Sequence, residues 1–178
     1  MPVNLKRVIA DAFFSLAQKK NIDKITVKEL VEKCGISRQS FYYHFRDVMD
    51  VMNWSLQQAI EEVLARSLQV DSTEKALAIF IRSAQENNAL IRRLLTSQRR
   101  AEIEQMLTRA IGIYLREMLR HRMGDLRFNP SDLETAADFC TYGVAGLLLK
   151  HCGSPNLDAD QLAHQLFELL SGALLRLG

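Results

Sequence analysis

The chain has 178 residues, of which 48% are hydrophobic, and a formal net charge of +2. This length and composition allow a sizeable buried core, and no stretch approaches the ~18 uninterrupted apolar residues of a membrane span. The start of the chain has no apolar segment followed by a small-residue cleavage site, and the three cysteines include no CxxC pair. We therefore expect a cytoplasmic protein with free thiols and no membrane partner. Few glycines and prolines, and no alternating strand pattern, predict an all-α fold.

The first predicted helix begins after Asn4, a residue type that can cap a helix. Apolar residues then recur three and four positions apart, which is typical of one buried helix face. They are Leu5, Val8, Ile9, Ala12, Phe13 and Leu16. The cations of Lys19 and Lys20 suit the end of this helix, because the carboxyl end of a helix carries partial negative charge.

Residues 25–47 predict two short helices joined by a tight turn. Thr26 and Glu29 are spaced as an N-cap and its capping-box partner, and Ser37 repeats the N-cap. Between them, Gly35 supplies the residue that a sharp turn needs at positive φ. The second helix carries side chains that can hydrogen-bond phosphates and base edges, namely Arg38, Gln39, Ser40, Tyr42, Tyr43 and His44. This pattern indicates a helix-turn-helix that reads the major groove, with an ordinary αα-hairpin as the alternative.

Positive charge is concentrated in the same part of the chain. Residues 1–46 hold nine Lys/Arg and four Asp/Glu, a net charge of +5. Because the whole chain carries +2, residues 47–178 carry −3, from 14 basic and 17 acidic residues. A basic segment on a slightly acidic body favours a phosphate-binding module attached to a neutral scaffold. A solvated face rich in lysine is the alternative, but it does not explain why the charge coincides with the helix-turn-helix.

The rest of the chain predicts six more helices, about nine in all. They begin at Asp47, at Asp71 or Ser72, near Leu90, near Ile103, at Ser131 with Glu134 as a capping box, and at Asp158.

The last two predicted helices carry more apolar surface than one buried face requires. The first of them contains glycines that let another backbone approach closely, and the second is rich in leucine. Such a pair favours burial in a symmetric partner, so we expect a homodimer. The expected interface residues are Tyr142, Gly143, Gly146, Leu147, Leu166, Leu169, Leu170 and Ala173. The alternative is burial of these residues within a monomer.

The segment GISRQSFYYHFRD resembles the signature of TetR-family transcriptional regulators. The likeness covers residues 5–56 well and extends beyond them only in the number and length of the helices. It implies an all-α protein with a three-helix DNA-binding head containing the helix-turn-helix, plus a six-helix ligand and dimerisation domain. The implied domains are residues 1–46, which bind DNA, and residues 47–178, which bind an effector and dimerise.

The resemblance also implies roles for individual residues. Thr26, Lys28 and Ser37 would contact phosphate, with Lys28 also able to reach a base. Arg38, Gln39 and Ser40 would read bases, whereas the side chains that fix the second helix against the DNA backbone would be Tyr42, Tyr43 and His44. Val48 departs from the family pattern, which commonly has a lysine there, so that phosphate contact is missing unless Asp47 and the free backbone N–H groups beside it compensate.

A narrower likeness concerns the subgroup that includes activators of dihydroxyacetone kinase operons. It rests on the run FYYHFRDVMDVMNW, which ends in Trp54, and on the short overall length. Some members of that subgroup respond to a partner protein rather than to a small molecule. Either kind of effector therefore remains open for this chain.

No catalytic constellation is apparent, and we expect neither an enzyme nor a cofactor. His151 and Cys152 are adjacent, but neighbouring residues on a helix point about 100° apart, so no metal site is expected. An effector pocket could be lined by Trp54, Phe80, Met106, Tyr114, Phe139 and Tyr142. A stripe of aromatic and methionine side chains is more often simply core.

Two functions follow from the sequence. The first is a homodimeric, sequence-specific transcriptional regulator that binds a palindromic double-stranded operator and responds to an unknown small molecule or protein. The second is a TetR-like adaptor or coactivator without its own operator. Salt dependence separates them, because several phosphate contacts make affinity fall steeply as salt rises.

Overall fold

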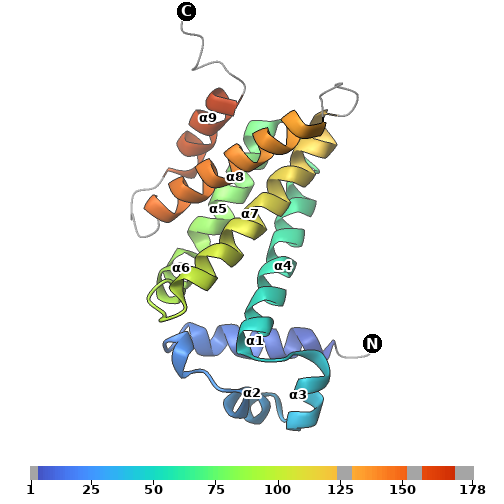
Figure 1. Cartoon of the computed structure of the whole chain (residues 1–178), viewed down its shortest axis with the longest axis vertical. Helices are drawn as coiled ribbons and strands as arrows, with labels where there is room; N and C mark the ends of the chain where they lie inside the picture. The colour runs from blue at the N-terminus through green and yellow to red at the C-terminus, as the bar shows by residue number, and fades with distance from the viewer. Residues whose placement is uncertain (1–3, 124–129, 152–157, 171–178) are drawn as a thin grey trace, which may run out of the picture. The chain divides into compact units, whose positions relative to one another are not determined.

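The computed structural model describes residues 4–123, 130–151 and 158–170. Over these ranges the chain is helical and contains no strand, which confirms the all-α prediction (Figure 1). The helices are α1 Leu5–Ala17, the short 3-10 helix η1 Ile22–Lys24, α2 Val27–Cys34, α3 Arg38–His44, α4 Val48–Ser67, α5 Thr73–Glu86, α6 Asn88–Leu94, α7 Arg100–Met123, α8 Pro130–His151 and α9 Ala159–Leu170.

The chain folds into two compact units, and each unit consists of two segments that are separate in the sequence. The N-terminal unit consists of Met1–Ala59 and Ala89–Met106, and the C-terminal unit consists of Ile60–Asn88 and Leu107–Gly178. Helices α4 and α7 therefore each belong to both units. The functional division between residues 46 and 47 stays a prediction.

The N-terminal unit is built around the apolar stripe of α1. Ile9 and Phe13 are fully buried, together with Leu30 of α2 and Phe41 of α3. The start of α4 completes this core, with Val51 also fully buried. A three-helix head of this size needs the extra apolar surface of α4 to be stable, because small cores bury too little on their own.

Most helix starts follow the predicted caps. The Asp47 carboxylate accepts a hydrogen bond from the backbone N–H of Asp50 (2.8 Å). Ser72, rather than Asp71, caps α5, and Asp158 accepts the N–H groups of Asp160 and Gln161 at the start of α9. Side-chain capping of the orphan N–H groups explains why these residue types stand at helix starts.

Two predicted caps are wrong. Asn4 occupies the N-cap position of α1, but its side chain makes no capping hydrogen bond. Ser131 lies inside α8, which begins at Pro130. Proline suits the first position of a helix, because it lacks the N–H that would otherwise need a partner there.

In the C-terminal unit, α9 packs along α5. The Arg82 guanidinium of α5 binds both carboxylate oxygens of Asp160 at 2.7 and 3.0 Å, and His164 lies 3.0 Å from the Glu74 carboxylate. Leu166, one of the predicted dimer residues, is only 4% exposed and is thus buried in its own chain. A second close approach joins α7 to α8, where a Cβ at Gly112 would lie 3.2 Å from Thr141 Cγ2.

Candidate nucleic-acid interface

The start of α2 is held by a complete capping box. Thr26 Oγ accepts the backbone N–H of Glu29 (3.3 Å), and Glu29 Oε2 accepts the backbone N–H of Thr26 (3.1 Å). Lys20 forms an ion pair with Glu29 from the end of α1. The hydrogen bond from Lys20, helped by the backbone of Thr26, lowers the pKa of the Glu29 carboxyl below its ordinary value. The side chains of Lys20, Thr26 and Glu29 therefore form one hydrogen-bonded group around the first turn of α2.

The turn between α2 and α3 has the conformation predicted for it. Gly35 has φ of 65°, in the left-handed region that side chains with a Cβ avoid. The backbone N–H of Ile36 donates to the carbonyl of Val31 (3.0 Å), and that of Gly35 donates to Glu32 (3.3 Å). These two bonds satisfy carbonyl groups at the end of α2 and set the direction of the chain into α3.

Helix α3 begins at the predicted cap and has one buried face. The Ser37 hydroxyl accepts the backbone N–H of Ser40 (3.1 Å). Phe41 is fully buried and lies against Phe45, with 6.1 Å between the ring centroids. Packing of these two rings fixes the rotation of α3 about its own axis. As a result the polar positions of the helix are directed outward.

The structure places every predicted DNA-contact residue in the N-terminal unit. Arg38 and Gln39 are exposed at the start of α3, and Tyr42 and Tyr43 are 57% and 85% exposed. The others are exposed or half-buried, namely Thr26, Lys28, Ser37, Ser40 and His44. Exposed aromatic and polar side chains on one short helix form a surface able to contact bases and phosphates. The separate base and phosphate roles stay predictions.

Two features set the charge of this surface. Lys28 has its Nζ 3.9 Å from the Glu32 carboxylate, an exposed pair that is weak in water and leaves the cation available to a phosphate. Val48, at the position where the family commonly has a lysine, is half-buried at the start of α4. Because valine is uncharged, position 48 adds no positive charge to this surface.

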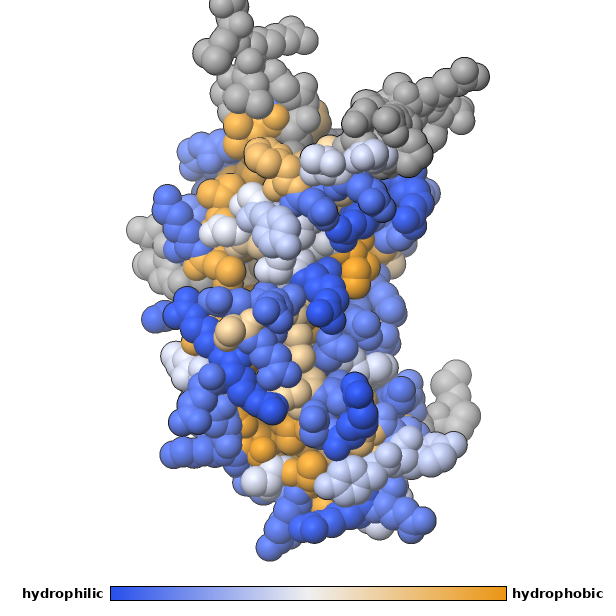
Figure 2. Space-filling model, in the orientation of Figure 1, coloured by the Kyte–Doolittle hydropathy of each residue, from blue (hydrophilic) through white to orange (hydrophobic). Residues whose placement is uncertain are grey.

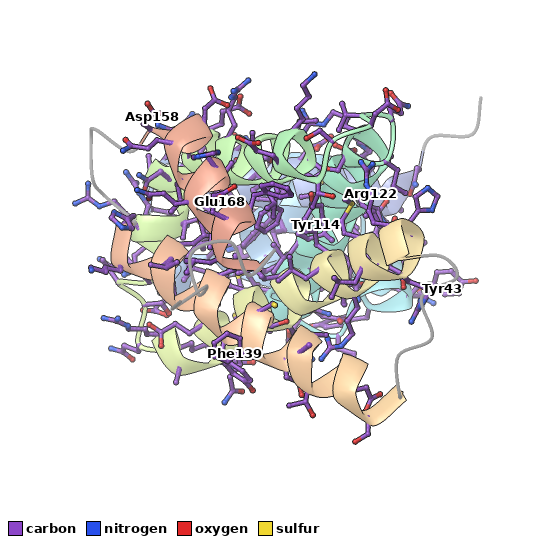
Figure 3. All side chains as sticks on the ribbon, turned by 90° about the horizontal axis from the view of Figure 1, so that it is seen from above. Tyr43, Tyr114, Arg122, Phe139, Asp158 and Glu168 are labelled. Carbon is purple, nitrogen blue, oxygen red and sulfur yellow. The ribbon has the colours of Figure 1, made fainter. Side chains whose placement is uncertain are left out.

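The residues predicted to line an effector pocket belong to different units and differ in burial. Phe80 and Tyr114 are buried and stacked on each other in the C-terminal unit. Phe139 and Tyr142 are 78% and 71% exposed, so they do not line an interior cavity of this chain. Figure 3 shows Tyr114 within the helices and Phe139 on the outer side of α8. Trp54 and Met106 are half-buried in the N-terminal unit.

The predicted dimer surface is largely exposed on α8 and α9. Gly143 and Gly146 are exposed, and within the described part of the chain a Cβ at either would meet no atom within 4 Å beyond its own helix backbone. Phe139 and Tyr142 lie on the same helix, and Leu169 of α9 is 42% exposed. Figure 2 shows apolar residues at the surface in the region of α8 and α9. Leu147 is half-buried, whereas Ala173 and the side chain of Leu170 lie outside the described residues.

Sequence reasoning missed one contact that bears on the interface. Asp23 of η1 accepts hydrogen bonds from the Ser97 hydroxyl (2.6 Å) and the Gln98 backbone N–H (2.9 Å). The partners are 74 and 75 positions away along the chain, which is beyond the reach of helical periodicity. The only local signal is Ser97 itself, a residue type that favours the start of a helix.

The described residues show neither a metal-ion cluster nor a membrane-spanning helix. Within residues 4–123, 130–151 and 158–170, no group of three His, Cys, Asp or Glu side chains is arranged to hold a metal ion. None of the helices in that part of the chain combines the length and apolarity needed to cross a membrane.

The helix-turn-helix region is similar to known proteins. Residues 9–47 match the model of bacterial regulatory proteins of the tetR family. The chain is also 22% identical over 89 residues to the HTH-type dhaKLM operon transcriptional activator DhaS of Lactococcus lactis subsp. lactis strain IL1403. That alignment spans 50% of this chain and 48% of the relative, about half of its length.

Solved structures with the same fold span nearly the whole chain. The dihydroxyacetone kinase operon activator DhaS has a TM-score of 0.71 at 16% identity, covering 97% of both chains. The TetR family repressor AlkX from Dietzia sp. strain DQ12-45-1b has a TM-score of 0.63 at 20% identity, covering 99% of this chain and 98% of its own. Residues 9–47 are therefore similar to the helix-turn-helix domain of tetR-family regulatory proteins, and the chain as a whole has the same fold as these two regulators.

Proposed function

We propose that this protein is a homodimeric transcriptional regulator that binds a palindromic operator and is controlled by an effector. Residues 1–46 bind DNA, and residues 47–178 bind the effector and dimerise. The observation that carries the proposal is α3, a short helix anchored by buried Phe41 that exposes Arg38, Gln39, Tyr42 and Tyr43. The net charge of +5 on residues 1–46 supports the same role, because a basic surface attracts the DNA backbone.

Homodimerisation is supported by the exposed apolar side chains of α8. Phe139 and Tyr142 leave most of their rings in solvent in the single chain. Surfaces of this kind usually mark protein contacts. A two-fold dimer presents two copies of α3 and therefore fits an operator with two-fold symmetry.

Control by an effector is the part of the proposal that rests on family likeness. The names of two similar proteins describe DhaS as an activator of a dihydroxyacetone kinase operon and AlkX as a repressor. Both signs of regulation therefore occur among proteins with this fold. A small molecule and a partner protein are both compatible with a C-terminal unit made of helices.

Selection of duplexes from a random pool tests the proposal. The wild-type chain should enrich a two-fold symmetric site, and its affinity should fall by orders of magnitude between about 50 and about 200 mM salt. Arg38→Ala should abolish the enrichment of a defined site. Lys33→Ala is the matched control, because it removes one exposed cation at the end of α2, outside the proposed contact set. An adaptor without its own operator would enrich no sequence.

A further inference from the structure

Asp23 supplies hydrogen-bond acceptors to the turn that precedes α7. Its Oδ1 accepts the Ser97 hydroxyl (2.6 Å), and its Oδ2 accepts the backbone N–H of Gln98 (2.9 Å). The Ser97 oxygen in turn accepts the backbone N–H of Arg99 (2.9 Å). Gln98 and Arg99 immediately precede Arg100, the first residue of α7. Asp23 and Ser97 together therefore hold the turn that leads into α7.

This contact is internal to the N-terminal unit and partly shielded from solvent. Ser97 is only 6% exposed, and η1 and residues 89–106 belong to the same compact unit. The hydrogen bonds from Ser97 and Gln98, with a smaller contribution from the charge of Arg99, hold the pKa of Asp23 below its ordinary value. The carboxylate is therefore the form that makes this contact.

Hydrogen bonds around η1 connect the segment that contains Asp23 to the start of α2. The Asp23 backbone N–H donates to Asn21 Oδ1 (2.8 Å), which shapes η1. Lys20 Nζ donates to the carbonyl of Lys24 (3.0 Å) and pairs with Glu29. Glu29 then forms the capping box with Thr26. Each link lies within the N-terminal unit, and the network ends at the residues proposed to meet the DNA backbone.

We propose that Asp23 is a positioning residue for DNA binding, because it fixes the start of α2, with Thr26 and Lys28, relative to the start of α7. The affinity for DNA then depends on where the α6–α7 turn lies. Since α7 continues beyond Met106 into the C-terminal unit, a shift of α7 could reach the DNA-contact residues by this route as well as through α4. The inference rests on the proposed function.

The competing explanation is that Asp23 only stabilises the fold. Spatial continuity alone does not establish coupling, so a double-mutant cycle is needed. The probe is the duplex that the wild-type chain enriches from a random pool. Asp23→Asn should weaken binding to it by about 5- to 30-fold, a typical range for losing hydrogen bonds to a charged group. Asp11→Asn is the matched control, because it removes the same charge from an exposed position of α1 and should not weaken binding.

The cycle pairs Asp23→Asn with Lys28→Ala. If Asp23 positions α2, Lys28→Ala should reduce affinity much less in the Asp23→Asn background than in the wild type. Additive losses would overturn the inference, as would equal affinities of Asp23→Asn and Asp11→Asn. If Asp23 only stabilises the fold, Asp23→Asn should lower the unfolding midpoint, and its effect on DNA affinity should add to that of Lys28→Ala. If circular dichroism shows Asp23→Asn to be unfolded, Ser97→Ala carries the same cycle.

Failure of the proposed function has a different signature. A wild-type chain that enriches no duplex contradicts the proposed function and the inference with it. A wild-type chain that enriches a duplex, together with an additive cycle, contradicts the inference alone.

Discussion

The Tyr114 ring of α7 lies almost parallel to the Phe80 ring of α5, with 4.3 Å between the ring centroids and 16° between the planes. The Tyr114 hydroxyl donates to the carbonyl of Ala76 (2.9 Å) and lies 2.8 Å from Ser67 Oγ. Burial raises the pKa of Tyr114 to about 12, although the Ser67 hydrogen bond and the charge of Arg122 oppose the shift. A neutral, fully paired phenol packed on another ring is a core arrangement rather than an open ligand site.

Tyr114→Phe should therefore lower the free energy of unfolding by about 1–1.5 kcal/mol, because the Ala76 carbonyl loses a buried hydrogen-bond donor. Urea unfolding followed by circular dichroism measures the change. Tyr43→Phe is the matched control, because the same hydroxyl is lost from a ring that is 85% exposed and lies outside the proposed dimer surface, where changes stay within about 0.5 kcal/mol. Equal effects of the two substitutions would contradict the core assignment.

Local signals predicted the helix-turn-helix well, because each one links residues only a few positions apart. The Thr26–Glu29 box, the Gly35 turn and the Ser37 cap all depend on hydrogen bonds within a single turn of the chain. The prediction at Ser131 was wrong for a local reason, since Pro130 also starts a helix. Sequence alone could not choose between these two starts.

Contacts between residues far apart in the sequence could not be predicted from these local signals. Leu166 and Leu169 have the same spacing pattern on α9, but only the first is buried in its own chain. Aromatic residues such as Phe139 and Tyr142 occur both in protein cores and at interfaces, so residue type alone did not predict their exposure. The Asp23–Ser97 contact joins residues 74 positions apart. Helical periodicity tells which residues share a face, but not which element covers that face.

Base readout should depend on Gln39. Gln39→Ala should reduce affinity for the selected duplex by about 1–3 kcal/mol and relax the preference at one base pair, because one base-edge contact is lost. Tyr42→Phe is the comparison, since loss of a phosphate contact should weaken all sequences alike. Competition binding with single-base variants of the duplex measures both. If Gln39→Ala weakens specific and unrelated duplexes equally, the role assignment is wrong.

Dimerisation should be blocked by Gly146→Arg. A Cβ at this position would have no contact within 4 Å outside its own helix backbone among the described residues, so the fold of the monomer should tolerate a side chain there while a close partner helix should not. Light scattering should show monomers, and operator binding should weaken. Ala65→Arg, at an exposed position of α4, is the control for the added charge. A Gly146→Arg protein that remains dimeric would exclude this face as the interface.

The contribution of Asp23 to stability should depend on pH. Hydrogen bonds from Ser97 and Gln98 hold its pKa below the ordinary 3.8 in the folded chain. The carboxylate therefore stabilises the folded state above that value, and the effect is lost as pH falls through the lower folded pKa. The difference in unfolding free energy between the wild type and Asp23→Asn should be constant near neutrality and shrink below about pH 4.

Urea titrations between about pH 7 and about pH 3 measure this difference. Ser97→Ala serves as the control. It removes the largest cause of the lowered Asp23 pKa, so in this variant the Asp23 pKa should lie closer to its ordinary value. A wild-type advantage that persists unchanged to the lowest pH would show that Asp23 acts without titrating.

Trp54 should report the switch between DNA-bound and released states. Its ring meets Phe45, at the end of α3, edge to face with 6.0 Å between centroids, and it is the only tryptophan in the chain. Helix α4 carries Trp54 and continues past Ala59 into the C-terminal unit. An effector that tilts α4 would change the separation of the two α3 helices of a dimer, which must lie about 34–36 Å apart to read adjacent half-sites.

A coupling free energy of about 1–3 kcal/mol would change DNA affinity by about 5- to 150-fold. Trp54 emission should therefore shift when the selected duplex binds, and shift back when a compound or partner protein releases it. Trp54→Phe provides the control, because it removes the only tryptophan of the chain, so no emission shift should remain. An effector that releases DNA while Trp54 emission stays as in the DNA-bound protein would contradict a mechanism based on α4 and would favour the route through α7 and Asp23.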